Sequence, residues 1–210
     1  MNMIDLVALP NVVWRAEPLL SADVPAEFPA DLKTSLAIAN GVVAFGGALH
    51  IRGLSRAERW HDILEVWTGS HSLATRYPRI RQSDIPFAEN CLGDQFIWRD
   101  GAVLQLIAET GELESVDASL RTFYERCAAR DPEIWLGTNF LRQFESDGGH
   151  LAPGQVLLVY PPLTFAESEH GVSLKAIDAL ESLDYWSEFA RKIRNLPEGA
   201  KVELVVKRER

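Results

Sequence analysis

The chain has 210 residues, of which 47% are hydrophobic and 24% charged, and its formal net charge is −9. A chain of this length can bury a core without metal ions or disulfides, so we expect a single domain over residues 1–210. The acidic balance argues against broad binding to nucleic-acid phosphates, which needs clustered Lys and Arg. It is compatible with a basic protein partner and also with ordinary solubility.

The cysteines and the N-terminal residues indicate the cellular compartment of the protein. Cys91 and Cys127 belong to no Cys-x-x-Cys pair, which predicts buried free thiols in a reducing cytoplasm. The first residues lack a basic stretch followed by an apolar run, so no secretory signal is predicted. No apolar run approaches the roughly 20 residues that a membrane-spanning helix needs. We therefore expect a cytoplasmic protein that does not enter the membrane.

The first third of the chain begins irregularly. Four prolines between positions 10 and 29 predict an irregular lead-in, residues 1–27, that wraps the surface. Apolar spacing then predicts a helix over residues 28–39, and Asn40-Gly41 ends it because both residues tolerate left-handed backbone. Two short strands follow, over residues 42–45 and 48–52, with a turn at Gly46-Gly47.

The next predicted element is an amphipathic helix that carries two tryptophans. Trp60, Ile63, Leu64 and Trp67 recur at i, i+3, i+4, i+7 spacing. Tryptophans on one stripe can line a ligand pocket. They are more often part of the core, because aromatic side chains carry a large apolar area.

The clearest pattern is a three-stranded meander. Strands are predicted over residues 95–99, 102–107 and 113–116, with turns at Asp100-Gly101 and Thr110-Gly111. Connections this short join antiparallel neighbours, because a parallel crossover needs a dozen residues or more.

Two helices are predicted after the meander. The first buries Leu120, Phe123, Tyr124 and Cys127, with Asp117 as its N-cap. The second begins at Asp131-Pro132-Glu133, where an acidic cap precedes a proline at the first helical position. Its buried face comprises Ile134, Leu141 and Phe144.

Residues 151–210 are expected to complete the same domain. The predicted elements are strand 156–160, a polar loop up to Gly171, strand 172–177, a helix with Trp186, Phe189, Ala190 and Ile193, and a closing strand at Val202, Leu204 and Val206. Helices and strands in this order predict an α+β fold, with a mixed, mainly antiparallel sheet and helices packed against it.

Residue types that carry catalysis or bind metals form no recognisable motif. Ser70 and His71 are neighbours, but adjacency alone does not create the geometry of a Ser-His-Asp triad. The five histidines lack zinc-site spacing, and Gly46-Gly47 lacks the Lys-Ser/Thr of a phosphate loop. We therefore predict a non-enzyme with no catalytic residue, no metal and no cofactor, while a site assembled from distant residues stays open.

Acidic residues concentrate in the middle of the chain. Between Asp84 and Glu125 nine acids and two bases give −7 of the total −9. Complementary charge speeds association with a basic partner, although such a face can also serve solubility alone. Strand alternation would place Glu112 and Glu114 on one face, away from Leu113. The candidate partner contacts are Asp94, Asp100, Glu109, Glu112, Glu114 and Asp117.

Several stretches resemble the SUKH superfamily, which joins bacterial immunity proteins of toxin systems with fungal regulators of cell-wall synthesis. The central stretch is Ile85-Pro86-Phe87-Ala88-Glu89-Asn90-Cys91-Leu92-Gly93-Asp94-Gln95-Phe96, followed by Asp100-Gly101 and Glu109-Thr110-Gly111-Glu112. The other stretches are Ala39-Asn40-Gly41, Pro161-Pro162-Leu163-Thr164-Phe165, Gly171-Val172-Ser173-Leu174 and Leu196-Pro197-Glu198-Gly199-Ala200. A second glycine expected beside Gly93 is replaced by Cys91-Leu92. The resemblance implies a mixed sheet with helices against it.

The resemblance also implies stoichiometric neutralisation of a toxin, often a nuclease, with no catalytic residues. The leading interpretation is a SUKH-like immunity protein that binds a cognate toxin through its basic surface. The alternative is a housekeeping regulatory or scaffold protein of the same fold, and a toxin gene nearby would distinguish them. A third hypothesis is a hydrolase with scattered acids and histidines, which a deep pocket with convergent polar groups would favour. The oligomeric state stays open.

Overall fold

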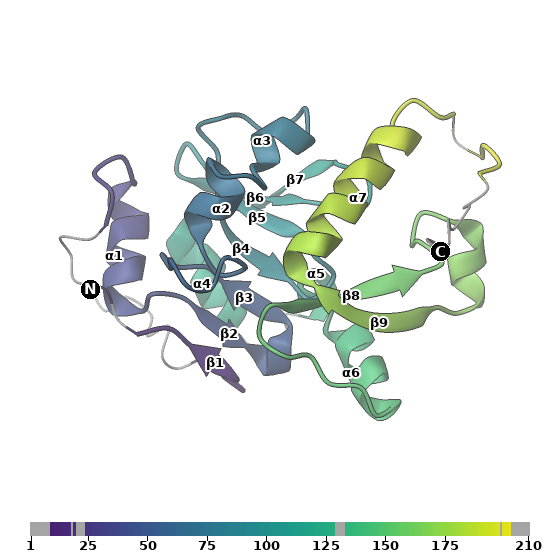
Figure 1. The fold of residues 1–210 in the computed structure, drawn as a ribbon, viewed down its shortest axis with the longest axis horizontal. Helices are drawn as coiled ribbons and strands as arrows, with labels where there is room; N and C mark the ends of the chain where they lie inside the picture. Colours follow the sequence, from purple (N-terminus) through teal and green to yellow (C-terminus); the bar gives the residue numbers. More distant parts are fainter. Residues whose placement is uncertain (1–8, 18, 20–23, 129–132, 198, 203–210) are drawn as a thin grey trace.

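A computed structural model of the chain describes all residues except 1–8, 18, 20–23, 129–132, 198 and 203–210. Within the described residues the main feature is a seven-stranded sheet whose strands follow chain order (Figure 1). They are β1 (Trp14–Arg15), β2 (Val42–Ala44), β3 (Leu49–Ile51), β4 (Ile85–Asn90), β5 (Gln95–Arg99), β6 (Ala102–Leu106) and β7 (Leu113–Asp117). Every pair of neighbouring strands in it is antiparallel.

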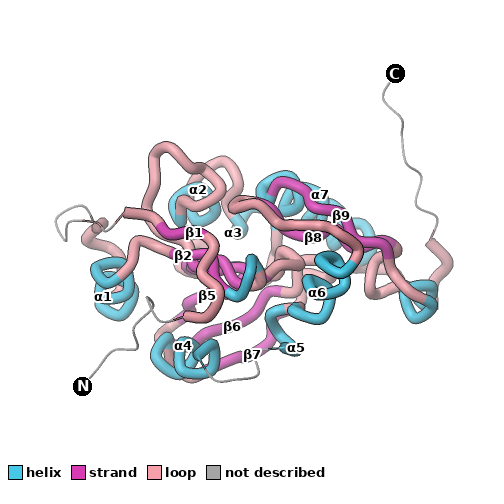
Figure 2. Tube along the Cα trace, turned by 90° about the horizontal axis from the view of Figure 1, so that it is seen from below, coloured by secondary structure: helices cyan, strands magenta, loops and turns pink. Residues whose placement is uncertain are grey.

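Helices pack against both faces of this sheet, so the fold is α+β, as the sequence predicts. Figure 2 shows α2, α3 and α7 on one side of the central strands and α4 on the other. The helices are α1 (Ala30–Ile38), α2 (Ile63–Trp67), α3 (Leu73–Arg76), α4 (Leu120–Ala128), α5 (Glu133–Leu136), α6 (Thr138–Ser146) and α7 (Ala179–Ile193), with 3-10 helices η3 (Phe45–Gly47) and η4 (Ala166–His170).

Alternation along the strands divides the apolar side chains between two layers. Phe96 of β5 packs against Phe123 of α4, with ring centroids 5.0 Å apart, and Phe87 of β4 lies 5.2 Å from the same ring. Ile97, the next residue of β5, belongs to the cluster that contains Tyr77 on the other side. Successive side chains of a strand point to opposite faces, so each face of the sheet builds its own core.

Strand β4 lies in the centre of the sheet, and all six of its residues are buried. A strand buried on both faces has no alternation of polar and apolar residues, so the sequence pattern assigns no element there. Pro86 cannot donate a ladder hydrogen bond, and the pairing with β5 shifts register between Pro86 and Ala88. The irregularity accommodates a residue that normally argues against a central strand.

The predicted meander is confirmed, together with its turns. β5 and β6 pair from Gln95 to Arg99 without a register shift. Asp100 and Gly101 have φ values of 52° and 90°, and positive values at both positions are what a type I′ hairpin requires. Gly111 takes φ 73° at the second turn.

The C-terminal part adds a second antiparallel sheet of two described strands, β8 (Gln155–Tyr160) and β9 (Ser173–Asp178). The N–H of Leu157 donates to the carbonyl of Cys91 over 2.7 Å, and the Leu157 side chain lies in the core that contains Phe87. Helix α7 follows and lies beside this hairpin (Figure 1). Its Trp186 and Phe189 are buried. The last third of the chain is thereby joined to the main sheet.

The tryptophan helix is shorter than predicted. Helix α2 begins at Ile63, so Trp60 lies outside it and packs instead against Trp14, with ring centroids 4.9 Å apart. Trp67 is partly buried against the core, and its indole N–H donates to the carbonyl of Gln82 over 2.9 Å.

Two predicted helix boundaries after the meander are wrong. Asp117 ends β7, and the first turn of α4 is capped by Ser119, whose hydroxyl accepts from the N–H of Thr122 over 3.2 Å. The predicted helix with Leu141 consists of two helices, α5 and α6, with Gly137 at φ 69° between them. Left-handed backbone at this position interrupts the helical hydrogen-bond pattern.

The chain ends differ from expectation or lie outside the described residues. The predicted irregular lead-in contributes β1, which pairs with β2 at the sheet edge. Val202 is not in a strand, while Asp131-Pro132 and the Leu204 and Val206 of the predicted closing strand lie outside the described residues. None of the described helices is both long and apolar enough to cross a membrane.

Both cysteines are buried free thiols, as predicted. Burial raises the pKa of Cys91 to about 12, and the charge of Asp94 adds to that increase. The thiol therefore stays protonated at neutral pH, which is the state expected of a structural cysteine.

The α4 layer can be tested by removing its central ring. Phe123 is fully buried and its ring meets those of Phe87, Phe96 and Trp135. Phe123→Ala should lower the free energy of unfolding by about 3–5 kcal/mol, measured by chemical denaturation. Exposed Arg121 on the same helix is the control, and Arg121→Ala should change stability by less than about 0.5 kcal/mol. Equal effects of the two substitutions would contradict this packing.

Candidate partner-binding surface

Two of the six predicted contact residues are exposed without a partner. The carboxylates of Glu112 and Glu114 make no hydrogen bond or ion pair with any described residue. Leu113 between them packs into the core on the α7 side of the sheet. Leu113 and Glu114 alternate along β7 in this way, whereas Glu112 precedes the strand and lines a groove beside α7.

Two further predicted contacts already have basic neighbours. Asp100 is 81% exposed at the hairpin tip and lies 3.2 Å from Arg81. Asp117 lies 3.2 Å from Arg126, but only 11% of its side chain is exposed. An ion pair as exposed as Asp100–Arg81 is weak. A partner can therefore displace Arg81 and contact the Asp100 carboxylate at little cost.

Glu109 lies in the interior, contrary to its predicted place on an exposed turn. Its carboxylate accepts hydrogen bonds from the backbone N–H of Leu163 over 3.0 Å and of Thr164 over 2.6 Å. The Thr164 hydroxyl donates to it as well. Glu109 therefore ties the turn between β6 and β7 to the loop that follows β8.

Asp94 also has a role inside the fold. Its carboxylate accepts from the N–H of Ala108 over 2.8 Å and from the side-chain amides of Asn90 and Gln105 over 3.1 Å. Burial raises the pKa of Asp94, and these three hydrogen bonds oppose that rise. The bonds connect the turn after β4 with the end of β6, which leaves Asp94 poorly placed for a partner.

Burial removes much of the acidic concentration seen along the sequence. Asp84, Glu89 and Glu109 are all buried, and Asp84 is paired with Arg99 over 2.5 Å. A count of charges along the chain therefore overstates the acidity of the surface. The exposed acids of this region are Asp100, Glu112, Glu114 and Glu125.

The free acids Glu112 and Glu114 lie at an edge of the main sheet. β7 is the terminal strand, and among the described strands it pairs with β6 alone. Arg126 covers one end of this edge by donating to the carbonyl of Val116 over 2.7 Å. No described strand pairs with the outer side of residues 113–115, which we call the open edge, and an open edge with acidic side chains can receive a partner segment.

A second acidic surface, which the sequence did not predict, lies beside α7. A groove of about 570 Å³ is lined by acids from the segment before α2 and from the start of α7. These acids are Glu58, Asp178, Glu181 and Asp184. They come from distant parts of the chain, so no local pattern could reveal their proximity.

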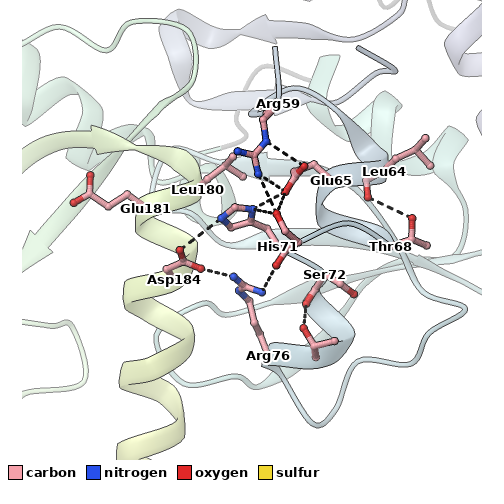
Figure 3. A network of polar contacts seen from close by, with 12 residues as sticks. Arg59, Leu64, Glu65, Thr68, His71, Ser72, Arg76, Leu180, Glu181 and Asp184 are labelled. Atoms are coloured by element: carbon pink, nitrogen blue, oxygen red, sulfur yellow. Dashed lines mark hydrogen bonds and ion pairs between the residues drawn. The ribbon is translucent and has the colours of Figure 1, made fainter. Parts of the chain in front are cut away.

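Most acids of this groove are already bound within the chain. Asp178 caps α7 by accepting from the N–H groups of Leu180 and Glu181 over 2.8 and 3.0 Å. Asp184 forms an ion pair with Arg76 and lies 3.5 Å from Nε2 of His71. Figure 3 shows Asp184 reaching from α7 toward these two side chains, while Glu181 points away from them.

Glu65 is the centre of the polar network in Figure 3. Its carboxylate accepts from Arg59 over 2.9 Å and from Ser70 over 2.5 Å, and lies 2.6 Å from Nδ1 of His71. The bond from Arg59 is the largest cause that holds the pKa of Glu65 at about 2, well below its ordinary value, with His71 and Ser70 contributing. Both ring nitrogens of His71 face carboxylates, Glu65 and Asp184.

This arrangement differs from a catalytic triad. In a triad the serine hydroxyl donates to a histidine nitrogen that is free to accept. Here the Ser70 hydroxyl donates to Glu65, and the 3.2 Å contact with His71 reaches a nitrogen that already faces this carboxylate. The network joins the α2–α3 region to α7 and leaves no base free for Ser70.

A buried polar network crosses strands β3, β4 and β5. Glu89 accepts from Arg52 over 2.7 Å and from Gln95 over 3.0 Å, and lies 2.8 Å from Nδ1 of His50. His50 and Gln95 are its direct partners on the two neighbouring strands. Burial raises the pKa of Glu89, but the charge of Arg52 and the hydrogen bonds of His50 and Gln95 outweigh burial and hold the pKa at about 2.

His61 extends this network to the backbone. Its Nε2 lies 2.7 Å from the carbonyl of Asn40, which can only accept, so Nε2 carries the hydrogen. Burial lowers the pKa of His61 to about 3, so its Nδ1 is free to accept from Nε2 of His50 over 2.9 Å. Nε2 of His50 then carries a hydrogen, so a hydrogen bond between Nδ1 of His50 and the carboxylate of Glu89 requires a second proton on this pair. The two groups therefore titrate as one coupled pair.

Gly41 makes room for this histidine. A Cβ atom at Gly41 would lie 2.1 Å from Cε1 of His61, and Gly41 has φ 87°. The Asn40-Gly41 pair that the sequence assigned to a helix end therefore also seats a buried side chain.

Comparison with known proteins supports the fold and assigns no function. No family model matches the chain, and no curated protein matches it. The crystal structure of Atu4351 from Agrobacterium tumefaciens is similar, with a TM-score of 0.51 and 11% identity over 84% of this chain and 85% of that one. A likeness at this identity concerns the fold alone, so the SUKH resemblance stays a prediction. Among the described residues no cluster of His, Cys, Asp or Glu is arranged to hold a metal ion.

The role of Glu109 can be tested with an isosteric change. Glu109→Gln replaces one acceptor oxygen with an amide that opposes a backbone N–H, so it should lower the free energy of unfolding by about 1.5–3 kcal/mol. Glu114→Gln makes the same chemical change on an exposed carboxylate and should have little effect. Denaturation curves of the two variants compare them directly. A loss of equal size in both would show that the Glu109 bonds do not stabilise the fold.

The buried network predicts lower stability in acid. The folded-state pKa of His61, about 3, lies below the ordinary value near 6.5, so between these values the unfolded chain binds more protons. Stability should therefore fall as the pH decreases below about 6.5, by roughly 1–2 kcal/mol between pH 7 and pH 5 from this group. Glu89 adds a further loss below its ordinary pKa, as the pH approaches its folded value of about 2.

Denaturation at several pH values checks this expectation. His61→Gln should remove part of the pH dependence, whereas the exposed His170, changed in the same way to Gln, should leave it intact. If His61→Gln kept the full slope between pH 7 and pH 5, the proton uptake would belong to another group.

Proposed function

We propose that this protein is a non-catalytic binding protein that neutralises a toxin with a basic surface, as an immunity protein of a toxin system. The observation that carries the proposal is the open β7 edge, where Glu112 and Glu114 are exposed and unpaired among the described residues. The resemblance of the central stretch to the SUKH superfamily supplies the class of partner. The proposed contacts are the accessible members of the predicted set, Asp100, Glu112 and Glu114, with Asp117 beside them.

The β7 edge is favoured over the acidic groove because its carboxylates are free. In the groove, Asp178 caps a helix and Asp184 is held by Arg76. A partner would have to break those contacts before it gained new ones. At the edge, Glu112 and Glu114 exchange contacts with water for contacts with a basic side chain, so no bond within the described part of the chain has to be broken.

A toxin that acts on nucleic acid offers a suitable partner. Surfaces that bind phosphates are basic, and an acidic inhibitor is attracted to them from a distance. The same attraction makes association sensitive to salt, because exposed charges are screened over about 8–10 Å at physiological ionic strength. Occupying the phosphate-binding surface would block the toxin without any chemical step.

Two other functions use the same fold differently. A housekeeping regulator or scaffold would present the same exposed edge to a partner that is not a toxin. A hydrolase would need a base that is free to act, and the Ser70–His71–Glu65 geometry does not favour one. The identity of the partner separates the first of these from immunity.

The partner can be identified by affinity purification of tagged protein from its native organism, followed by mass spectrometry. A stoichiometric complex with a toxin-domain protein encoded by a neighbouring gene is the expected outcome. Co-expression should then protect cells from that toxin. Failure to recover any specific partner while such a toxin is expressed would count against immunity.

Charge reversal at the edge tests the proposed contacts. The double variant Glu112→Lys, Glu114→Lys should keep its fold and lose at least tenfold in affinity for the recovered toxin, or about 1.4 kcal/mol. Glu109 is left out because its reversal would break the interior bonds described above. The matched control is Glu167→Lys, Glu169→Lys, which makes the same charge change in the exposed η4. Equal losses in both variants would place the interface elsewhere.

A further inference from the structure

A groove with the opposite charge lies on the other side of the β6–β7 turn. It has a volume of about 590 Å³ and is formed by the residues around the end of α3, this turn and the last turn of α7. Four arginines line it, and Glu112 is its one acidic lining residue among the described residues. The arginines are Arg76, Arg79, Arg191 and Arg194. We call it the arginine groove.

Three of these arginines have weak or no partners. The guanidinium groups of Arg79 and Arg194 make no hydrogen bond or ion pair with any described residue. Arg191 has a single 4.0 Å contact with Glu188. Arg76 differs, because Asp184 holds its guanidinium in place, as Figure 3 shows, and the carbonyl of Ser70 accepts from it over 3.0 Å.

Helix stability explains only part of this concentration of charge. Arg191 lies in the last turn of α7 and Arg194 is its C-cap residue, and cations at a helix C-terminus are favourable. That effect does not account for Arg76 and Arg79, which come from a different part of the chain. Like charges gathered in one groove repel each other, so their proximity in a protein of net charge −9 calls for an anion.

The floor of the groove is apolar. Tyr77 is 1% exposed and its hydroxyl donates to the carbonyl of Ala108 over 3.0 Å, so it lines the groove as a buried residue and offers a ligand little surface of its own. Ala190 is buried and Ile193 partly buried beside it. An apolar floor below a cationic rim is suited to a molecule that has both an anionic and an apolar part.

We propose that the arginine groove binds a phosphate-bearing small molecule, with its phosphates on Arg79, Arg191 and Arg194 and its apolar part against Ile193. The planar guanidinium presents two N–H groups to two phosphate oxygens at once. Small-molecule sites typically enclose about 300–1,000 Å³, and this groove falls within that range. Several arginines match the multiple charge of a diphosphate better than the single charge of a carboxylate. This site adjoins the proposed toxin contact and shares Glu112 with it.

Calorimetric titration at low salt, without divalent cations, tests the proposal with defined probes. Inorganic pyrophosphate and ATP should both bind with Kd below about 1 mM, and ATP should bind more tightly because its base can cover the apolar floor. Citrate supplies similar charge as carboxylates and should bind more weakly. If neither phosphate compound binds, or if citrate binds as well as pyrophosphate, the proposal fails.

Substitutions locate the site. Arg79→Gln and Arg194→Gln should each weaken pyrophosphate binding by about tenfold, while the same change at the exposed Arg121 of α4 should leave it unchanged. Glu112→Gln should strengthen binding several-fold, because it removes the acidic group of the groove. An equal loss in Arg121→Gln would show nonspecific attraction.

Glu112 also separates the two proposals. Its neutralisation should weaken the toxin complex and strengthen pyrophosphate binding. If Glu112→Gln leaves the affinity for the toxin unchanged, the proposed toxin contact fails. If it leaves the affinity for pyrophosphate unchanged, the proposed groove site fails.

Discussion

The buried carboxylate of Glu89 sets the arrangement of the central strands. An ionised carboxylate away from water costs several kcal/mol unless charges and hydrogen bonds compensate for it. His50 of β3, Arg52 directly after β3 and Gln95 of β5 supply them here. A slip of one residue along any of these strands would turn a partner to the opposite face. The network therefore favours one register in a region where the strands are apolar on both sides.

The same network reaches beyond the sheet. His50 meets His61, and His61 donates to the carbonyl of Asn40, so the loop after α1 and the turn before α2 are held against β3. Gly41 lacks the Cβ that would collide with this ring. Polar side chains buried in this way are costly when one member is lost, because the others remain desolvated. They restrict this side of the molecule to one arrangement.

The burial of several acidic residues determines the charge distribution on the surface. Asp84, Glu89 and Glu109 are bound inside the fold, and Asp94 is partly covered. Of the exposed acids of the middle region, Glu114 lies in β7 and Glu112 directly before it, while four arginines line a groove beside the β6–β7 turn. Glu112 lies at the border of the two surfaces. A protein whose net charge is negative thus presents two adjacent surfaces of opposite sign. The acidic one is suited to a basic protein and the basic one to a phosphate.

Local patterns in the sequence determined the meander, its Asp100-Gly101 hairpin and the buried faces of α4 and α7, because hydrophobic period and turn chemistry act over a few residues. The alternation of buried Leu113 and exposed Glu114 followed from the same rule, but Glu112 lies before the strand. Tertiary structure alone decided that β4 is the central strand, that Glu109 faces inward, and that Arg79 and Arg194 meet across a groove. The physical reason is distance along the chain: burial, pairing and charge neutralisation depend on segments that only folding brings together.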